Sequence, residues 1–297
     1  MQTSRLLPEE GSANPPGGTH LLWYAGYYCR IRLGGAYFFD CFLLFYIAYK
    51  RPQAAFFAGR EPSETEEKLL QRILNADIVD ITPIDGGFIY AEKKMLENGS
   101  CRVSFYSYDC ETSISTPITR GEYVSCKFGQ NGSRIADELG QKGEFIFAQP
   151  TRFFNNCTVT LDRAGTFSLF TPEGSCVRRY EFTYQGAPVC NPVAYEKSLW
   201  CVVPERDAII NYSIDEARVL LRIGGGAQSA FSYPTSITLI RGNIYVCNRD
   251  SHKIRTVQIG NSTYAIDDYR TFNEPVYKYF RVGSREYALL DSGVYEI

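Results

Sequence analysis

Six polar residues, each placed after a short apolar run, are the first candidates for chemistry in this sequence. They are Asp40, Glu92, Asp162, Glu205, Asn248 and Asp291, and the last four are spaced at intervals of 43 residues. Carboxylate and amide oxygens gathered in a ring would bind a polar ligand or a hard cation such as calcium. The same side chains also cap turns by accepting backbone N–H bonds. We favour turn capping, because the residue recurs in every copy.

Arginines form a second periodic set. Arg163, Arg206 and Arg249 directly follow three of the polar residues and are again 43 residues apart. The planar guanidinium, with five donors, suits an acidic peptide, a phosphate or RNA. Ion pairing between blades, with neighbouring carboxylates such as Asp207 and Asp250, is the favoured alternative.

Signs of catalysis are sparse. The chain has two histidines, His20 and His252, and the polar context of His252 favours a role in a turn over that of a general base. Ten cysteines include no Cys-x-x-Cys pair, so neither a zinc cluster nor another metal site is expected. No catalytic residue, metal or cofactor is assigned from the sequence.

The elements that carry these residues are short β-strands. Apolar runs rich in β-branched and aromatic residues alternate with Gly, Asn and Asp turns, a pattern typical of hairpins. The second strands of four copies read TVTLDR, CVVPER, IYVCNR and YALLDS. A fixed period of this length is the sequence signature of a β-propeller, in which each repeat is one blade.

The clearest copy also resembles a known repeat. Gly224-Gly225-Gly226 precedes FSYPTSITLIRGNIYVCNRDSHKIR at 231–255, and residues 224–255 together resemble an NHL-type β-propeller repeat. The resemblance implies a blade, with His252 at a turn position where such repeats often carry His. It does not specify a function.

We therefore expect an all-β fold, a six-bladed β-propeller of four-stranded antiparallel blades. Two looser copies, at Tyr37–Asp40 and Phe88–Glu92, bring the count to six. The expected order is a disordered tail at 1–18, then one propeller domain at 19–297 with blades at about 27–59, 77–128, 143–184, 191–225, 235–271 and 274–297. A strand within 19–26 is expected to close the ring by completing the last blade, which otherwise has three strands.

Two short helices are expected between the first three blades. Ser63 and Glu66 form a capping-box pattern ahead of an apolar face, which predicts a helix at 63–75. A second short helix is predicted at 132–140, and a polar loop at 109–120. We expect these segments to cluster on one sector and to offer a binding surface.

Composition narrows the function classes. The formal net charge of −2 gives no bulk attraction to nucleic acid or anionic membranes, and the apolar stretch 36–49 is too short to span a bilayer. The cysteines fall mostly within strands, which suggests buried free thiols and a reducing, cytoplasmic location. We expect a non-catalytic scaffold that binds a protein partner and is monomeric outside its complex. The alternatives are an enzyme of lactonase, lyase or cyclase type with an axial acid or metal site, and an RNA-binding NHL-like module.

Overall fold

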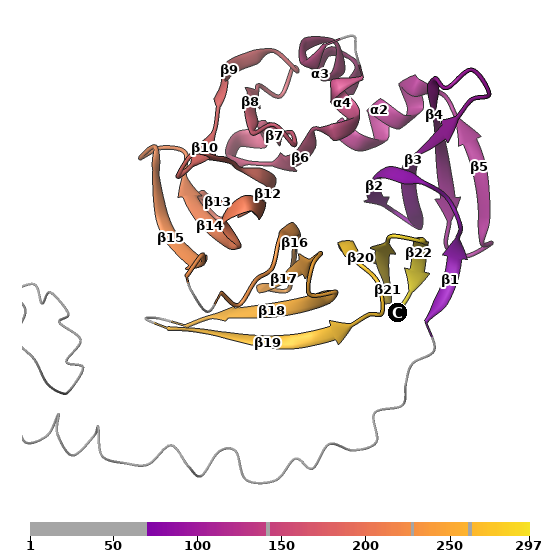
Figure 1. Ribbon diagram of the computed structural model, residues 1–297. Helices are drawn as coiled ribbons and strands as arrows, with labels where there is room; N and C mark the ends of the chain where they lie inside the picture. Colours follow the sequence, from indigo (N-terminus) through magenta and orange to yellow (C-terminus); the bar gives the residue numbers. More distant parts are fainter. Residues whose placement is uncertain (1–69, 141–142, 227–228, 261–262) are drawn as a thin grey trace, which may run out of the picture. The chain divides into compact units, whose positions relative to one another are not determined.

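Five four-stranded antiparallel sheets surround a common axis and form a β-propeller (Figure 1). The computed structural model describes residues 70–140, 143–226, 229–260 and 263–297, which belong to a compact unit at Thr65–Ile297. The predicted tail 1–18, the strand 19–26 and the blade 27–59 lie outside the described residues. Each sheet is one blade, and its strands follow one another from the axis outward.

Four blades consist of strands that are consecutive in the sequence. They are β2 (Ile78–Ile84), β3 (Gly87–Met95), β4 (Cys101–Asp109) and β5 (Ile114–Ile118); β6 (Gln149–Arg152), β7 (Thr158–Leu161), β8 (Thr166–Phe170) and β9 (Cys176–Glu181); β12 (Cys190–Tyr195), β13 (Ser198–Val203), β14 (Ala208–Ser213) and β15 (Arg218–Gly224); and β16 (Pro234–Ile240), β17 (Asn243–Asn248), β18 (Lys253–Ile259) and β19 (Tyr264–Thr271). A two-stranded ribbon, β10 (Thr183–Tyr184) with β11 (Ala187–Pro188), follows the β6–β9 blade.

The fifth blade joins the two ends of the described chain. It contains β20 (Val276–Val282), β21 (Arg285–Leu290) and β22 (Gly293–Glu296), and β1 (Gln71–Leu74) pairs antiparallel with β22. An N-terminal strand therefore completes the three C-terminal strands, as the sequence predicts, but β1 holds the position that was assigned to residues 19–26. This pairing covers an edge of β22 that would otherwise be open.

The predicted count of six blades is wrong, because the ring contains five. Since β1 leads directly into β2, the pairing of β1 with β22 links the last blade to the first and leaves no place for another sheet. The 43-residue period itself is confirmed, because its four polar residues lie at or just after the ends of β7, β13, β17 and β21. The period marks the regular blades but does not determine how many blades the ring contains.

Apolar clusters between neighbouring blades hold the ring together. One contains Leu161 and Phe167 from the β6–β9 blade and Leu199 and Ile210 from the β12–β15 blade, all four fully buried. Another joins Phe88 of β3 with Phe280 and Tyr287 of the fifth blade, and the rings of Phe280 and Tyr287 stack 5.4 Å apart. The blades are thus stabilised chiefly by contact with each other.

A helical insertion lies between the β2–β5 and β6–β9 blades (Figure 1). It contains α2 (Arg120–Phe128), α3 (Gly132–Leu139) and α4 (Glu144–Phe147). The helix predicted at 132–140 is confirmed as α3, whereas α2 was missed. Its capping box, Thr119 with Glu122, is nonetheless formed in full, and the same pattern is readable in the sequence.

Two of the other expected insertions are strands. Residues 71–74 of the predicted helix 63–75 form β1, and residues 114–118 of the predicted loop 109–120 form β5, the exposed outer strand of its blade. The remaining helices also have a structural role that was not expected. Tyr123, Val124 and Phe128 of α2 pack with Ile135 of α3 and Phe145 of α4 in one buried cluster.

Candidate functional site

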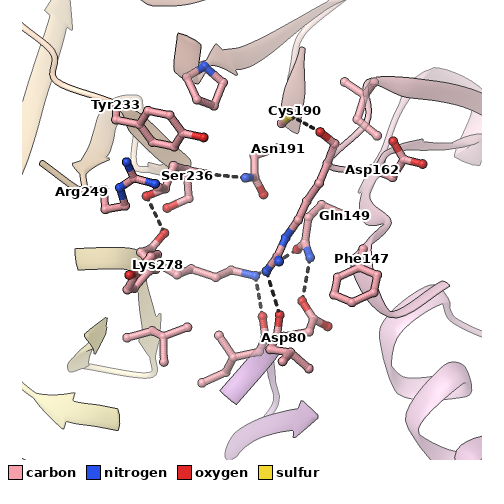
Figure 2. Close-up of a pocket in the computed structure, with 18 residues that line it drawn as sticks. Asp80, Phe147, Gln149, Asp162, Cys190, Asn191, Tyr233, Ser236, Arg249 and Lys278 are labelled. Carbon is pink, nitrogen blue, oxygen red and sulfur yellow. Dashed lines mark hydrogen bonds between the residues drawn. The ribbon is translucent and has the colours of Figure 1, made fainter. Parts of the chain in front are cut away.

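A cavity of about 300 Å³ lies among the innermost strands of the blades (Figure 2). All five innermost strands contribute to its lining: Asp80 comes from β2, Gln149 from β6, Asn191 from β12, Ser236 from β16 and Lys278 from β20. Its volume falls at the lower end of the range for small-ligand sites. We call it the axial pocket.

One wall of the axial pocket is built around a buried carboxylate. Asp80 and Lys127 of α2 form an ion pair with 2.8 Å between Oδ2 and Nζ, and their side chains are 2% and 0% exposed. Tyr123 donates its hydroxyl to the same oxygen, and Gln149 Nε2 donates to Oδ1 at 2.6 Å. Both carboxylate oxygens are therefore engaged.

The protonation of this pair follows from its neighbours. Burial alone would raise the pKa of Asp80, but Lys127, Lys278 and the Tyr123 hydroxyl lower it to about 2. Burial lowers the pKa of Lys127 to about 8, although Asp80 opposes this change. At neutral pH the pair is ionised and internally compensated.

Two further cations converge on β2 from different blades. Lys278 Nζ donates to the Ile81 carbonyl at 2.5 Å and to Gln149 Oε1 at 3.2 Å. Arg163 Nη2 donates to the Val79 carbonyl at 3.2 Å. Burial lowers the pKa of Lys278, against the attraction of Asp80. Among the described residues, neither Lys278 nor Arg163 has a carboxylate within 4.0 Å.

Aromatic rings hold the two arginines of the axial pocket. The Arg163 guanidinium lies 4.9 Å from the ring centre of Phe147, and that of Arg249 lies 3.6 Å from the ring centre of Tyr233. Arg249 also pairs with Asp250 at 2.7 Å. Stacking fixes the planes of both groups and still leaves N–H donors at their edges.

The structure separates the three periodic arginines. Arg163 and Arg249 line the axial pocket, whereas Arg206 donates to the Gln185 carbonyl on an exposed turn. Arg249 does pair with Asp250, but this ion pair joins adjacent residues of one turn and not two blades, as the alternative interpretation had it. Arg206 therefore has the same place in the repeat without a place in the pocket.

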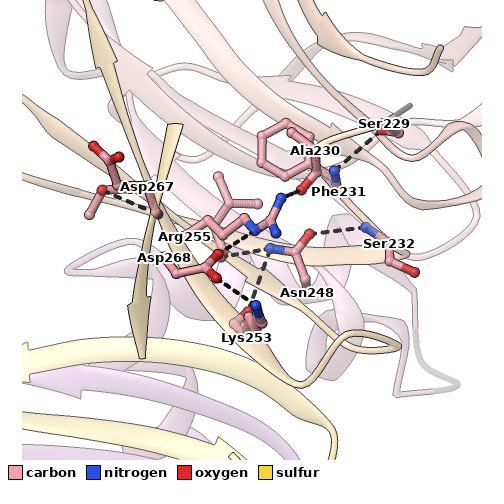
Figure 3. Close-up of polar contacts among 11 residues, drawn as sticks. Ser229, Ala230, Phe231, Ser232, Asn248, Lys253, Arg255, Asp267 and Asp268 are labelled. Carbon is pink, nitrogen blue, oxygen red and sulfur yellow. Dashed lines mark hydrogen bonds and ion pairs between the residues drawn. The ribbon is translucent and has the colours of Figure 1, made fainter. Parts of the chain in front are cut away.

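The periodic carboxylates and amide do not form an axial ring. Among the described members, Asp162 alone lines the axial pocket, and it accepts from the N–H groups of Ala164 and Thr166 at 2.9 and 2.7 Å. Asn248 is fully buried and accepts from Ser232 N–H at 3.2 Å (Figure 3). The bonds of Asp162 fit turn capping, whereas the bond of Asn248 joins segments 16 residues apart.

The other members of the set lie apart from the axial pocket. Asp291 accepts from the Tyr277 hydroxyl at 2.9 Å, Glu92 pairs with Lys94 at 3.0 Å, and Glu205 lies in the 3₁₀ turn η3 (Pro204–Arg206). Asp40 lies outside the described residues. His252 adopts a left-handed turn conformation, with φ 56°, in keeping with the turn role expected for it.

Two basic residues outside the axial pocket share one carboxylate. Asp268 accepts from Lys253 at 2.5 Å and from Arg255 at 2.8 Å (Figure 3). In the described part of the chain, no group of three or more His, Cys, Asp or Glu side chains is placed to hold a metal ion. No helix among those residues is long and apolar enough to cross a membrane.

The periodic signals missed the pocket residues Asp80, Gln149 and Lys278, and also Lys127, which pairs with Asp80. Two of them carried a different signal. Asp80 interrupts the strand IVDITPI and Lys278 interrupts VYKYFRV, and an ionisable residue in an apolar strand needs a buried partner or a ligand.

Comparison with known proteins adds the following. No family model and no curated protein sequence matches the chain. Among solved structures, virginiamycin B lyase from Staphylococcus aureus is similar at 10% identity and a TM-score of 0.45, over 74% of this chain and 80% of the other. A nidogen/laminin complex is similar at 11% identity and a TM-score of 0.39, over 73% of each chain. YCF48 bound to D1 peptide is similar at 12% identity and a TM-score of 0.40, over 80% of this chain and 66% of the other. These likenesses assign no function, and it is the ring of five four-stranded sheets that makes the chain a β-propeller.

Proposed function

We propose that this protein is a non-catalytic binding module that holds a protein partner by an acidic segment of that partner at the axial pocket. The observation that carries the proposal is an excess of positive charge. The lining of the axial pocket contains three cations, Arg163, Arg249 and Lys278, and two carboxylates, Asp80 and Asp162. The partners behind them, Lys127 and Asp250, cancel each other, so one positive charge is left over. A pocket with an excess positive charge that is shielded from water attracts an anion.

The protonation states of Asp80 and Cys190 favour binding over catalysis. Asp80 is held ionised, with a pKa of about 2 and both oxygens occupied, so it is a poor proton acceptor. Burial raises the pKa of the Cys190 thiol to about 12, so it is not a thiolate nucleophile at neutral pH. Neither Asp80 nor Cys190 is therefore an activated base or nucleophile.

A protein partner is favoured over RNA. An RNA-binding face needs a stripe of uncompensated cations beyond a single pocket. Lys253, Arg255 and Lys94 are paired with Asp268 or Glu92. The helical insertion, which the sequence suggested as the binding surface, is a weaker choice because it uses its apolar residues to fill the space between two blades.

The test is a comparison of ligand classes with the intact protein. Fluorescence anisotropy would follow four labelled probes, hexaglutamate, hexaglutamine, hexalysine and a six-nucleotide uridine RNA, at one ionic strength. We expect saturable binding of hexaglutamate that weakens with added salt, and little binding of hexaglutamine or hexalysine. Equal or tighter binding of the RNA would favour the nucleic-acid alternative, and binding of hexalysine would contradict the proposal.

A further inference from the structure

Lys278 has a hydrogen-bond donor left over. A lysine ammonium carries three N–H donors, and two of those of Lys278 are used, on Ile81 O and Gln149 Oε1. The nearest carboxylate, Asp80, is engaged through Oδ2 by Tyr123 and Lys127 and through Oδ1 by Gln149. The third donor of Lys278 has no protein acceptor within hydrogen-bond distance among the described residues.

A second polar group at the same place lacks a strong partner. Ser236 lines the axial pocket on β16, and the residue is 3% exposed. Its hydroxyl interacts with the Cys247 thiol, which is a weak hydrogen-bonding group, and bonds to no other described residue. Lys278 also lies close to Cys247: burial raises the pKa of this thiol to about 12, and Ser236 and Lys278 each lower it. The weakly bonded hydroxyl and the unfilled ammonium donor therefore belong to one region.

Charge balance indicates what this region would take. Asp80 compensates Lys127, and the excess positive charge of the axial pocket amounts to one unit. Arg163 approaches β2 beside Lys278, two residues away along the strand, and contacts Val79 O with one of its five donors. A group with one negative charge and two acceptor oxygens would meet both cations and the Ser236 hydroxyl.

We propose that the floor of the axial pocket binds a single carboxylate through Lys278, Arg163 and Ser236. This inference rests on the proposed function and makes it specific: the carboxylate is an aspartate or glutamate side chain of the partner, inserted toward the axis. A small free carboxylate would occupy the same position and compete with the partner. A phosphate dianion would bring a second negative charge, which exceeds the single positive charge left over in the axial pocket as a whole.

The probes that test this site are glutarate, its neutral isostere glutaramide, and inorganic phosphate, titrated calorimetrically into the intact protein at one ionic strength. We expect glutarate to bind, glutaramide to bind at least tenfold more weakly, and phosphate to bind more weakly than glutarate. Glutarate should also displace labelled hexaglutamate. Equal binding of glutarate and glutaramide would overturn the inference, and tighter binding of phosphate would overturn the choice of a monoanion.

Variants locate the site. Lys278→Met keeps the length of the side chain and removes its charge, and we expect at least a tenfold loss of glutarate affinity. Ser236→Ala removes the hydroxyl alone and should cost about threefold. Lys253→Met, which removes a charge paired with Asp268 outside the axial pocket, is the matched control and should bind like the wild type. Wild-type affinity in either pocket variant would exclude this site.

Two further outcomes separate the inference from the proposed function. If Lys278→Met does not fold, as judged by circular dichroism, then Ser236→Ala and the competition assay decide. If hexaglutamate binds but neither glutarate nor Ser236→Ala affects it, the carboxylate site is wrong and the binding module stands. If glutarate binds at the axial pocket and hexaglutamate does not bind at all, the site stands and the protein-partner function is wrong.

Discussion

Asp80 and Lys127 form an ion pair that joins the innermost strand of one blade to a helix outside the sheets. The 2.8 Å contact is closed to solvent on both sides, and Lys127 also donates to the Ile146 carbonyl at 2.6 Å. One cation thereby connects β2, α2 and α4. The pair shapes the axial pocket, and it also fixes the helical insertion to the ring.

Removing one partner of this pair should be costly. Lys127→Met leaves a buried carboxylate without its cation, and we expect a loss of about 3–5 kcal/mol in the free energy of unfolding, measured by urea denaturation. The double variant Asp80→Asn with Lys127→Met should recover part of that loss. Lys94→Met, which breaks the exposed pair with Glu92, serves as control and should leave stability nearly unchanged. A similar effect of Lys94→Met and Lys127→Met would contradict the assigned role.

The free energy of unfolding should decrease at acid pH as Asp80 becomes protonated. The folded-state pKa of Asp80 is lowered from 3.8 to about 2, so the unfolded chain binds the proton more readily between these values. The contribution is therefore complete above pH 4 and is lost as the pH falls through 2, and it amounts to about 2 kcal/mol. Urea midpoints measured from pH 5 to pH 2 should decline less steeply in Asp80→Asn. An equally steep decline in the variant would assign the acid sensitivity to other groups.

The regular part of the fold was readable because it repeats. A hydrophobic strand that ends in a polar turn every 43 residues marks the second strand of each regular blade, and the helix at Gly132–Leu139 could also be found. The blade count failed because closure depends on which distant strand meets β22. A local capping pattern favoured a helix over residues 71–74, but pairing with β22 makes them a strand.

Closure by β1 predicts a sensitive position far from the axis. Ile73 packs against the cluster that contains Phe280 and Val294, so Ile73→Asp would place an unpaired carboxylate there. We expect it to lower the unfolding free energy by about 2–4 kcal/mol, seen as a lower urea midpoint. Gln71→Asp on the exposed start of the same strand is the control. Equal stability of the two variants would mean that β1 does not hold the ring.

The cysteines should separate by accessibility. Cys101 and Cys126 are exposed, whereas Cys110, Cys190, Cys201 and Cys247 are buried, and burial raises the pKa of the last three of these. A thiol reagent at pH 8 should modify Cys101 and Cys126 in the native protein well before the buried four, as mapped by peptide mass spectrometry. Unfolding without reductant should release all ten thiols of the chain. A smaller number would reveal disulfides and would argue against a reducing compartment.

The candidate site was less accessible to sequence reasoning than the fold. Periodicity pointed to Arg163, Arg206 and Arg249 as equivalents, yet the structure places the first and third at the axial pocket and the second on an exposed turn. Lys278 and Asp80 lie on the inner strands of different blades, and neither belongs to a set of residues that recurs from blade to blade. Their proximity depends on ring closure, which brings β20 beside β2.

The most direct test of the binding account compares arginines that are equivalent in the repeat but not in space. Hexaglutamate affinity would be measured by anisotropy for the wild type, for Arg163→Gln with Arg249→Gln, and for Arg206→Gln. We expect the double variant to lose about 10- to 100-fold in affinity, since two charge-assisted contacts are removed, whereas Arg206→Gln should bind as the wild type does. Equal losses in both variants, or none in the double variant, would contradict the axial pocket as the binding site.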